Sequence, residues 1–337
     1  MAVQDDRLRV GRTRLARMRT GLVLTAALVA LSACETVSDE SPDLTSAPVI
    51  EPAAPGTVEL AERALAEDRY EDARKLLERV FIADPGHVKG RLVAAELALA
   101  TGNPETAAAR FNALTEEPEV AAEALQGRGL TQLLIGESDE AKASLEEAVA
   151  RDPELWRAWN GLGYYYDSKR QWRRSSEAYG KALVRQPDSA MVLNNRGFSF
   201  FMQRRLEEAI ADFRKALQED PDFALARENL RLALAWNGDY IRAMAGVRER
   251  ELARVLNNVG FIAILRGDYA NAEAYLTRAM EIDPSFNVAA SRNLAYLEQV
   301  RELEKSEGTP SAALPPPPES DLPTPLAAPL SDPSATP

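Results

Sequence analysis

The feature that most constrains this chain is a regular repeat in its central part. Pro153, Pro187 and Pro221 stand at equal intervals, and each follows Asp or Gln at the end of a stretch with helical spacing of apolar residues. A unit of this length holds two short helices, and a single helix pair cannot bury its own apolar face. Stacked pairs bury a continuous core. The period therefore predicts an all-α solenoid of about seven helix pairs, without strands, over residues 57–306.

Within each unit, small residues stand where the two helices must approach, and large residues fill the space beside them. The pattern is clearest in units 122–155, 156–189, 190–223 and 253–286. In the second of these units it consists of Trp159, Leu162, Gly163, Tyr166, Tyr179, Ala182 and Pro187. Four such units in one register resemble the tetratricopeptide repeat. This resemblance implies a superhelical solenoid of helix pairs.

Three further units match the pattern more weakly, namely 54–87, 88–121 and 224–252. The last of them is shorter than the others and lacks a closing proline, so we expect its second helix to be shortened. A charged helix over residues 287–306 is expected to cap the array, because a solenoid must end in a polar outer face.

Residues 1–33 have the composition of a targeting segment and are interpreted as a signal peptide. Six arginines and two aspartates give them a charge of +4 within a chain of net charge −12, which leaves −16 on the remainder. The uncharged stretch 21–31 has the length of a signal-peptide core and is too short to span a bilayer of about 30 Å.

The segment Leu31-Ser32-Ala33-Cys34 follows this apolar core and resembles the bacterial lipobox. The resemblance implies that Cys34 carries lipid and anchors the chain to a membrane, facing the periplasm. Residue 35 is Glu, whereas Asp at this position is the familiar inner-membrane retention signal, so the outer membrane is favoured over the inner membrane. The alternative is an ordinary secretory signal followed by a chance cysteine.

Two segments flank the expected solenoid and lack any period. Residues 35–56, after the lipidated Cys34, are rich in Ser, Pro, Ala and acidic residues, so 34–56 are expected to form a disordered tether. Residues 307–337 contain ten prolines and are expected to be a disordered tail, partly in polyproline II conformation.

Composition argues against most enzyme classes. The single histidine and single cysteine cannot build a zinc site of Cys and His ligands, an iron–sulfur cluster or a two-cysteine redox centre. The acidic chain has no basic stripe that would attract nucleic acid. An enzyme or enzyme-fused domain is the second hypothesis, but no segment outside the repeats could bury a catalytic core. We expect no catalytic residue, no cofactor and no metal, and a protein or peptide as the partner.

Seven residues form the candidate wall of a concave groove, because the first helix of each unit faces that side. They form an apolar run where polar residues would be normal, which suggests a hydrophobic binding strip. The alternative is that they pack against neighbouring helices or the terminal cap. The residues are Tyr164, Phe198, Phe201, Met202, Trp236, Phe261 and Ile264.

Asn195, Asn229 and Asn258 recur at the sixth position of three units. They resemble the asparagines with which some tetratricopeptide proteins hold a peptide backbone, since a side-chain amide offers both a donor and an acceptor. Arg157 and Arg196 would suit a carboxylate clamp, but no second matched Lys-Asn set accompanies them.

Lipobox and repeats together resemble the lipoproteins of the tight-adherence (Flp) pilus assembly system. That resemblance covers about residues 20–300 and includes the stretches VLNNRGF and VLNNVGFIAILRGDY. It implies an adaptor that helps to assemble or locate the outer-membrane secretin. Lipidated repeat scaffolds for cell-wall hydrolases and pilotins of type IV pili fit nearly as well, because tetratricopeptide motifs recur across many functions.

Overall fold

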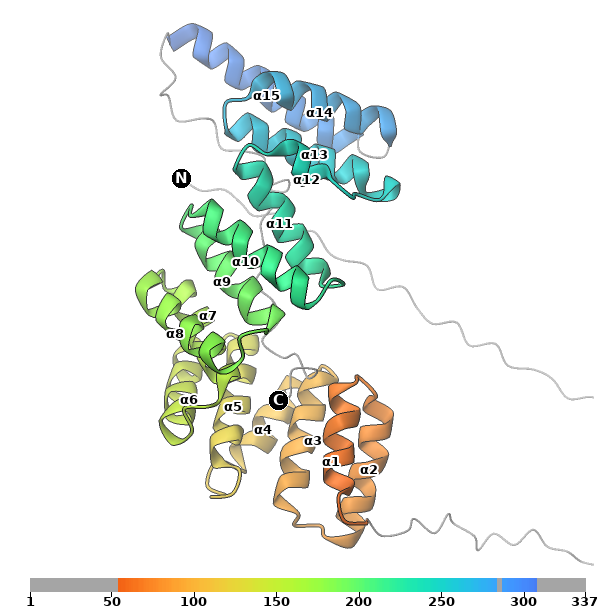
Figure 1. The fold of residues 1–337 in the computed structure, drawn as a ribbon, viewed down its shortest axis with the longest axis vertical. Coiled ribbons are helices and arrows are strands. Elements are labelled where there is room, and N and C mark those ends of the chain that lie inside the picture. Colours follow the sequence, from red (N-terminus) through yellow and green to blue (C-terminus); the bar gives the residue numbers. More distant parts are fainter. Residues whose placement is uncertain (1–53, 284–286, 308–337) are drawn as a thin grey trace, which may run out of the picture. The chain divides into compact units, whose positions relative to one another are not determined.

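A computed structural model describes residues 54–283 and 287–307, and every regular element in these two ranges is an α-helix (Figure 1). The expected all-α solenoid of helix pairs is thus confirmed. The first helices of the units are α1 (Thr57–Ala66), α3 (Val88–Ala100), α5 (Ala121–Ile135), α7 (Trp156–Ser168), α9 (Ala190–Met202), α11 (Ala224–Trp236) and α13 (Glu249–Leu265). The second helices are α2 (Tyr70–Ala83), α4 (Pro104–Asn112), α6 (Ser138–Arg151), α8 (Trp172–Arg185), α10 (Leu206–Glu219), α12 (Tyr240–Met244) and α14 (Tyr269–Ile282), and α15 (Asn287–Glu307) follows.

Second helices end where the sequence places its Asp-Pro pairs. Asp84, Asp152 and Asp220 each follow the last helical residue and adopt an extended backbone, with φ −144° and ψ 96° at Asp84. A proline ring disfavours the α conformation of the residue before it. The prolines therefore end these helices at constant intervals, which keeps the units in register.

Contact between the two helices of a unit depends on a glycine in the first helix. A Cβ atom added at Gly163 of α7 would lie 2.5 Å from Cε1 of Tyr179 on α8. Tyr179 is fully buried, and its hydroxyl donates a hydrogen bond of 3.0 Å to Oδ2 of Asp167. The glycine thus leaves the space that the tyrosine ring fills.

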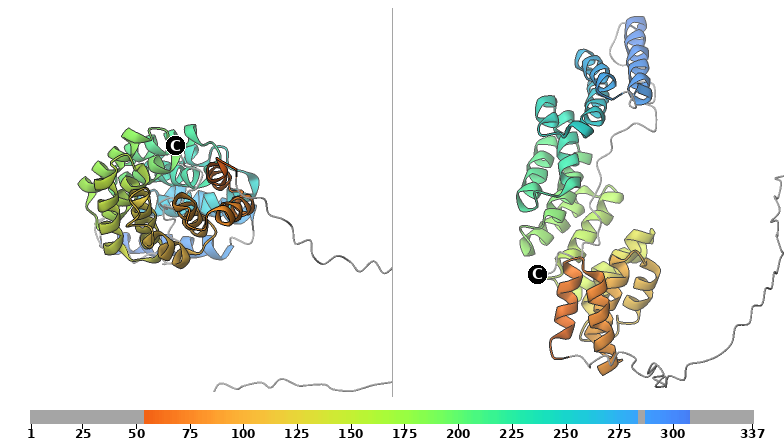
Figure 2. Two further views of the ribbon diagram at one scale, coloured as in Figure 1. Left: turned by 90° about the horizontal axis from the view of Figure 1, so that it is seen from below. Right: turned by 90° about the vertical axis from the view of Figure 1, so that its right-hand side faces the viewer.

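Helices pack against elements close in the chain, as a solenoid requires, and the first helices of successive units also touch one another. α1 contacts α3, α3 contacts α5, and α5 contacts α7. Figure 2 shows α1 and α2 lying side by side from two further directions. Contact between first helices gives the units a shared face.

The short unit 224–252 has a second helix, α12, of only five residues, which confirms the expected shortening. Around it, α11 is joined to α13 by ion pairs. Arg254 donates two hydrogen bonds to the Glu228 carboxylate, at 2.7 and 3.2 Å. Arg231 lies 3.6 Å from Glu228 and 3.8 Å from Glu251.

Helix α15 covers the last helix pair. Tyr296 of α15 packs against the buried ring of Phe261 on α13, with ring centroids 6.0 Å apart. None of the helices in the described ranges combines the length and apolar character needed to cross a membrane. The expected signal peptide, Cys34, almost all of the tether and almost all of the Pro-rich tail lie outside the described residues.

Candidate functional site

The apolar strip that the sequence suggested is in large part core. Phe261 and Ile264 are completely buried, and Phe201 is nearly so, in one cluster formed by α9 to α15. Here the structure favours the packing alternative, because α15 packs on α13, which carries Phe261 and Ile264, and Phe201 of α9 is buried in the same cluster. These three residues are therefore corrected from groove to core.

Four other residues of the strip keep some exposure. Tyr164, Phe198 and Trp236 are half-buried against their local clusters, and the guanidinium of Arg204 lies 4.3 Å from the Trp236 ring centroid. Met202 is 47% exposed. Tyr164, Phe198 and Trp236 pack against the hydrophobic clusters of their own units.

Two of the three expected asparagines, Asn195 and Asn229, are buried and bind other asparagines. Their amides join the first helix of one unit to that of the next, so the structure gives them a place in helix packing. Asn258 is half-buried, and its neighbour Asn257 takes the corresponding place. The bonds run from Asn195 to Asn160 (3.2 Å), from Asn229 to Asn194 (2.9 Å) and from Asn293 to Asn257 (3.0 Å).

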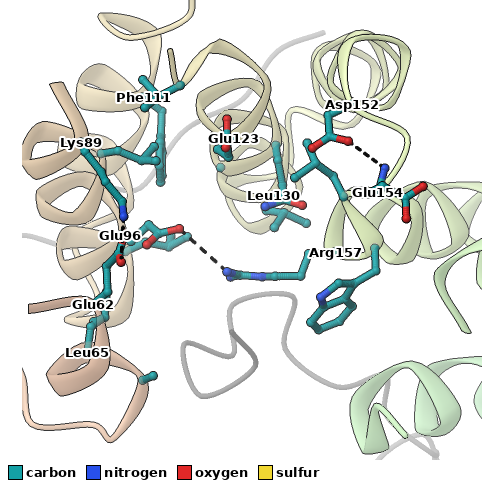
Figure 3. A pocket seen from close by; sticks show the side chains of 18 of the residues that line it. Glu62, Leu65, Lys89, Glu96, Phe111, Glu123, Leu130, Asp152, Glu154 and Arg157 are labelled. Atoms are coloured by element: carbon teal, nitrogen blue, oxygen red, sulfur yellow. Dashed lines mark hydrogen bonds and ion pairs between the residues drawn. The ribbon is translucent and has the colours of Figure 1, made fainter. Parts of the chain in front are cut away.

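A cavity of about 800 Å³ lies instead on the first-helix face of the first four units (Figure 3). We call it the N-terminal groove. It is walled mainly by α1, α3, α5, α7 and the residues that precede α5 and α7, with Phe111 of α4 and Arg185 of α8 at its edges. Its apolar wall includes Leu65, Leu92, Leu130, Phe111 and Trp156. Six carboxylates and four cationic side chains also line it: Glu62, Glu96, Glu119, Glu123, Asp152, Glu154, Arg63, Lys89, Arg157 and Arg185.

Charged side chains from different units meet inside the N-terminal groove. Nζ of Lys89 lies 3.2 Å from the Oε2 atom of Glu62, while Nη1 of Arg157 reaches across to Oε1 of Glu96 at 4.0 Å (Figure 3). The Arg157 side chain is only 14% exposed, and its Nε atom is buried without a hydrogen-bond partner among the described residues. The contact of Arg157 with Glu96 is too long for a hydrogen bond.

Burial between the groove walls raises the pKa of the Glu96 carboxyl. Arg157 opposes this rise, while the nearby carboxylates of Glu62 and Glu123 add to it. Desolvation and like charges both disfavour an ionised carboxylate. A further positive charge near Glu96 would therefore stabilise the ionised form of its carboxylate.

The sequence carries a signal for this groove in the charged residues of its first four units, whereas the apolar strip predicted from the sequence lies in the last four units. Glu62 and Glu96 stand one repeat apart at the ninth position of their units, and Lys89, Glu123 and Arg157 recur at the second position. Arg157, one of the two candidates for a carboxylate clamp, faces the groove. Arg196, the other candidate, is engaged by Asp212 at 2.7 and 2.8 Å.

The described residues contain no group of three or more His, Cys, Asp or Glu side chains that could hold a metal ion. In these ranges the groove offers carboxylates, cations and apolar side chains on a helical face. Such a surface is suited to recognition of a peptide segment.

Comparison with known families agrees with this architecture. Four family models, each described as "Tetratricopeptide repeat", match residues 64–128, 127–171, 190–223 and 253–286. The chain is a tetratricopeptide-repeat protein. Tetratricopeptide (TPR) repeats indicate a scaffold for protein–protein interaction.

Individual relatives of the TPR protein cover only parts of it or are distant. Superkiller complex protein 3 of Mus musculus is 30% identical over 122 residues, which are 36% of this chain and 8% of the mouse protein. Cut9–Hcn1, an APC/C heterotetramer, gives a TM-score of 0.54 at 18% identity and covers 72% of this chain and 48% of the other. Pseudomonas aeruginosa PilF gives 0.45 at 16% identity, covering 71% and 96%. The Cut9 likeness shows the fold alone.

Proposed function

We propose that this TPR protein is a lipid-anchored adaptor of the bacterial periplasm. In this proposal the N-terminal groove holds a segment of a partner protein while an envelope machine is assembled. The groove itself is the observation that carries the proposal, because a TPR array with a cavity of about 800 Å³ on its first-helix face has a surface suited to a peptide.

The membrane anchor in this proposal is Cys34. It rests on the order of a basic run, an uncharged stretch over residues 21–31 and the lipobox-like Leu31-Ser32-Ala33-Cys34. A fatty acyl chain contributes about 0.8 kcal/mol per buried methylene, and more than one chain makes anchoring stable. Cys34→Ser is expected to abolish labelling by a fatty-acid analogue and to release the protein from membranes. Thr36→Ser is the matched control, and a labelled, membrane-bound Cys34→Ser protein would contradict the anchor.

Crosslinking tests whether a partner occupies the groove. A photoreactive amino acid at position 119, which lines the groove, is expected to form an adduct with one defined envelope protein. The same amino acid at position 116, which is exposed and does not line the groove, is the control. Equal adducts from both positions, or adducts from position 116 alone, would contradict binding in the groove.

The machine we propose is the secretin of a tight-adherence pilus, on the strength of the sequence resemblance. Deleting the gene for this protein is then expected to reduce the heat-stable secretin multimer in the outer-membrane fraction. Re-expression of the wild-type chain should restore the multimer, and Cys34→Ser should not. An unchanged amount of the multimer would contradict a role in secretin assembly. If the crosslinking experiment instead captured a cell-wall hydrolase, the adaptor would be assigned to the hydrolase.

A further inference from the structure

Two carboxylates of the N-terminal groove are left with little or no compensation. Glu96 is 30% exposed, and among the described residues its only ion-pair partner is the guanidinium of Arg157, at 4.0 Å. Glu123 is half-buried, and no described residue gives it a hydrogen bond or an ion pair. Lys89 is already shared between Glu62 at 3.2 Å and Glu59 at 3.6 Å. The groove thus presents negative charge that its own cations do not match.

We infer that the N-terminal groove accepts a partner segment bearing a lysine or arginine, whose cation lies among Glu62, Glu96 and Glu123. The inference rests on the proposed function, since it names the chemistry of the segment that the groove would hold. Across the whole lining, six carboxylates face four cationic side chains, which gives an excess of two negative charges. A cationic segment matches that excess, whereas an acidic one adds to it.

The electrostatics of Glu96 support the same occupant. Its pKa is raised first by burial, and the carboxylates of Glu62 and Glu123 raise it further against the effect of Arg157. An incoming ammonium or guanidinium would reverse the repulsion and form charge-assisted hydrogen bonds, which are stronger than neutral ones. Binding therefore relieves a cost that the empty groove carries.

Shape and apolar lining suit the stem of such a side chain. Ala66, Ala100 and Leu155 line the same cavity as the carboxylates and are half-buried, so each keeps some apolar surface toward it. Lysine and arginine can bury their methylene stems on apolar surface while the charged head reaches polar groups. The groove, at about 800 Å³, lies within the range of about 300–1,000 Å³ that is usual for ligand sites.

A phage-displayed library of random dodecapeptides, selected against the full chain, supplies the probe. The tightest peptide is synthesised twice, once as selected and once with its lysine or arginine replaced by norleucine. Affinities are measured for the wild type, for Glu96→Gln combined with Glu123→Gln, and for Glu116→Gln as a matched control outside the groove. Ala66→Trp, which fills the groove without changing its charge, reports whether a peptide binds there at all.

The inference predicts enrichment of lysine or arginine in the selected peptides. Replacing the lysine or arginine of the peptide by norleucine should weaken binding by at least tenfold, or about 1.4 kcal/mol. Combining Glu96→Gln with Glu123→Gln in the protein should weaken binding of the unchanged peptide by at least the same factor. Glu116→Gln should have no effect, and added salt should weaken the wild-type complex. The inference would be overturned if Ala66→Trp weakens binding of the selected peptides but these peptides are neutral or acidic, or bind the Glu96/Glu123 double variant as tightly as the wild type. Binding of a peptide in the groove would still hold in that case. If Ala66→Trp weakens the affinity of none of the peptides, peptide binding in the groove is itself rejected.

Discussion

Gly163 shows how one missing side chain sets the distance between two helices. The ring of Tyr179 occupies the place where a Cβ atom would stand, and the tyrosine is fully buried. Interiors are packed so densely that added methylenes force rotamer and backbone shifts. The same argument applies at Gly197, where Phe213 fills the space.

Replacing Gly163 by Leu is expected to lower the free energy of unfolding by about 1–3 kcal/mol through overpacking against Tyr179. Denaturant titration followed by circular dichroism would measure the change. Gly180→Leu is the control on α8, because a Cβ there meets nothing within 4 Å. A Gly163→Leu protein as stable as the Gly180→Leu protein would contradict the packing account.

Glu96 allows a prediction of how stability depends on pH. Its folded-state pKa lies above the ordinary value of 4.5, so its charged form costs folding free energy at neutral pH. Below the ordinary value the carboxyl is protonated in both states, and this cost vanishes. Glu96→Gln should therefore raise the melting temperature at pH 7 and change it little at pH 4.

The exposed Glu116→Gln serves as the reference in those melts and should shift the melting temperature at neither pH. A Glu96→Gln protein that melts lower than the wild type at pH 7 would show that the ion pair with Arg157 outweighs burial.

At the scale of the helix, the ends and lengths of helices could be predicted from the sequence, because they depend on residues that are close in the chain. Helix ends could be predicted because a proline acts on the residue directly before it, as at Asp84 and Asp152. The short α12 followed from the reduced length of the unit 224–252. The burial of Phe261 could not be predicted in the same way, because it depends on α15, whose Tyr296 belongs to a later part of the chain.

The groove was missed for a related reason. An apolar residue on the first-helix face packs or binds according to which helices cover it, and sequence spacing does not decide that. Charged residues carry a clearer signal, since Glu62 and Glu96 recur one repeat apart and charges are rarely buried without a partner. The asparagines were assigned to a ligand because an amide pairs equally well with a peptide or with another asparagine.

The junction of α11 and α13 provides a prediction at this scale. Burial works to raise the pKa of Glu228, but Arg254 and Arg231 outweigh it, so its pKa lies below the ordinary value. A double-mutant cycle of Glu228→Ala and Arg254→Ala should give a coupling of about 0.5–1 kcal/mol at pH 7, since Arg254 is 42% exposed and partly screened.

That coupling should persist down to the ordinary pKa of 4.5 and disappear as the pH falls through the lower folded-state pKa. The exposed pair of Arg278 and Glu281 within α14 is the reference and should couple more weakly. A coupling at α11 and α13 that is unchanged at pH 2 would contradict an ionic contact.

For the molecule as a whole, contacts between neighbouring units make stability a local property. In such arrays it is approximately the sum of unit stabilities and nearest-neighbour interfaces. Gly163→Leu should accordingly increase amide hydrogen exchange most in α7 and α8, less in α5, α6, α9 and α10, and least in α1, α2 and α14. Hydrogen exchange read by mass spectrometry tests this, and a uniform increase would indicate a single cooperative unit.

Different positions of the repeat serve packing and binding. Gly129 and Gly163 stand at the eighth position of their units and face the second helix, while Glu62 and Glu96 stand at the ninth and Glu123 at the second and face the groove. Under the proposed function, folding and partner preference are thus encoded by separate residues, at repeat positions that differ by as little as one. Evolution could exchange the charges at the groove positions and recruit this protein to a new partner, without rebuilding the array that displays them.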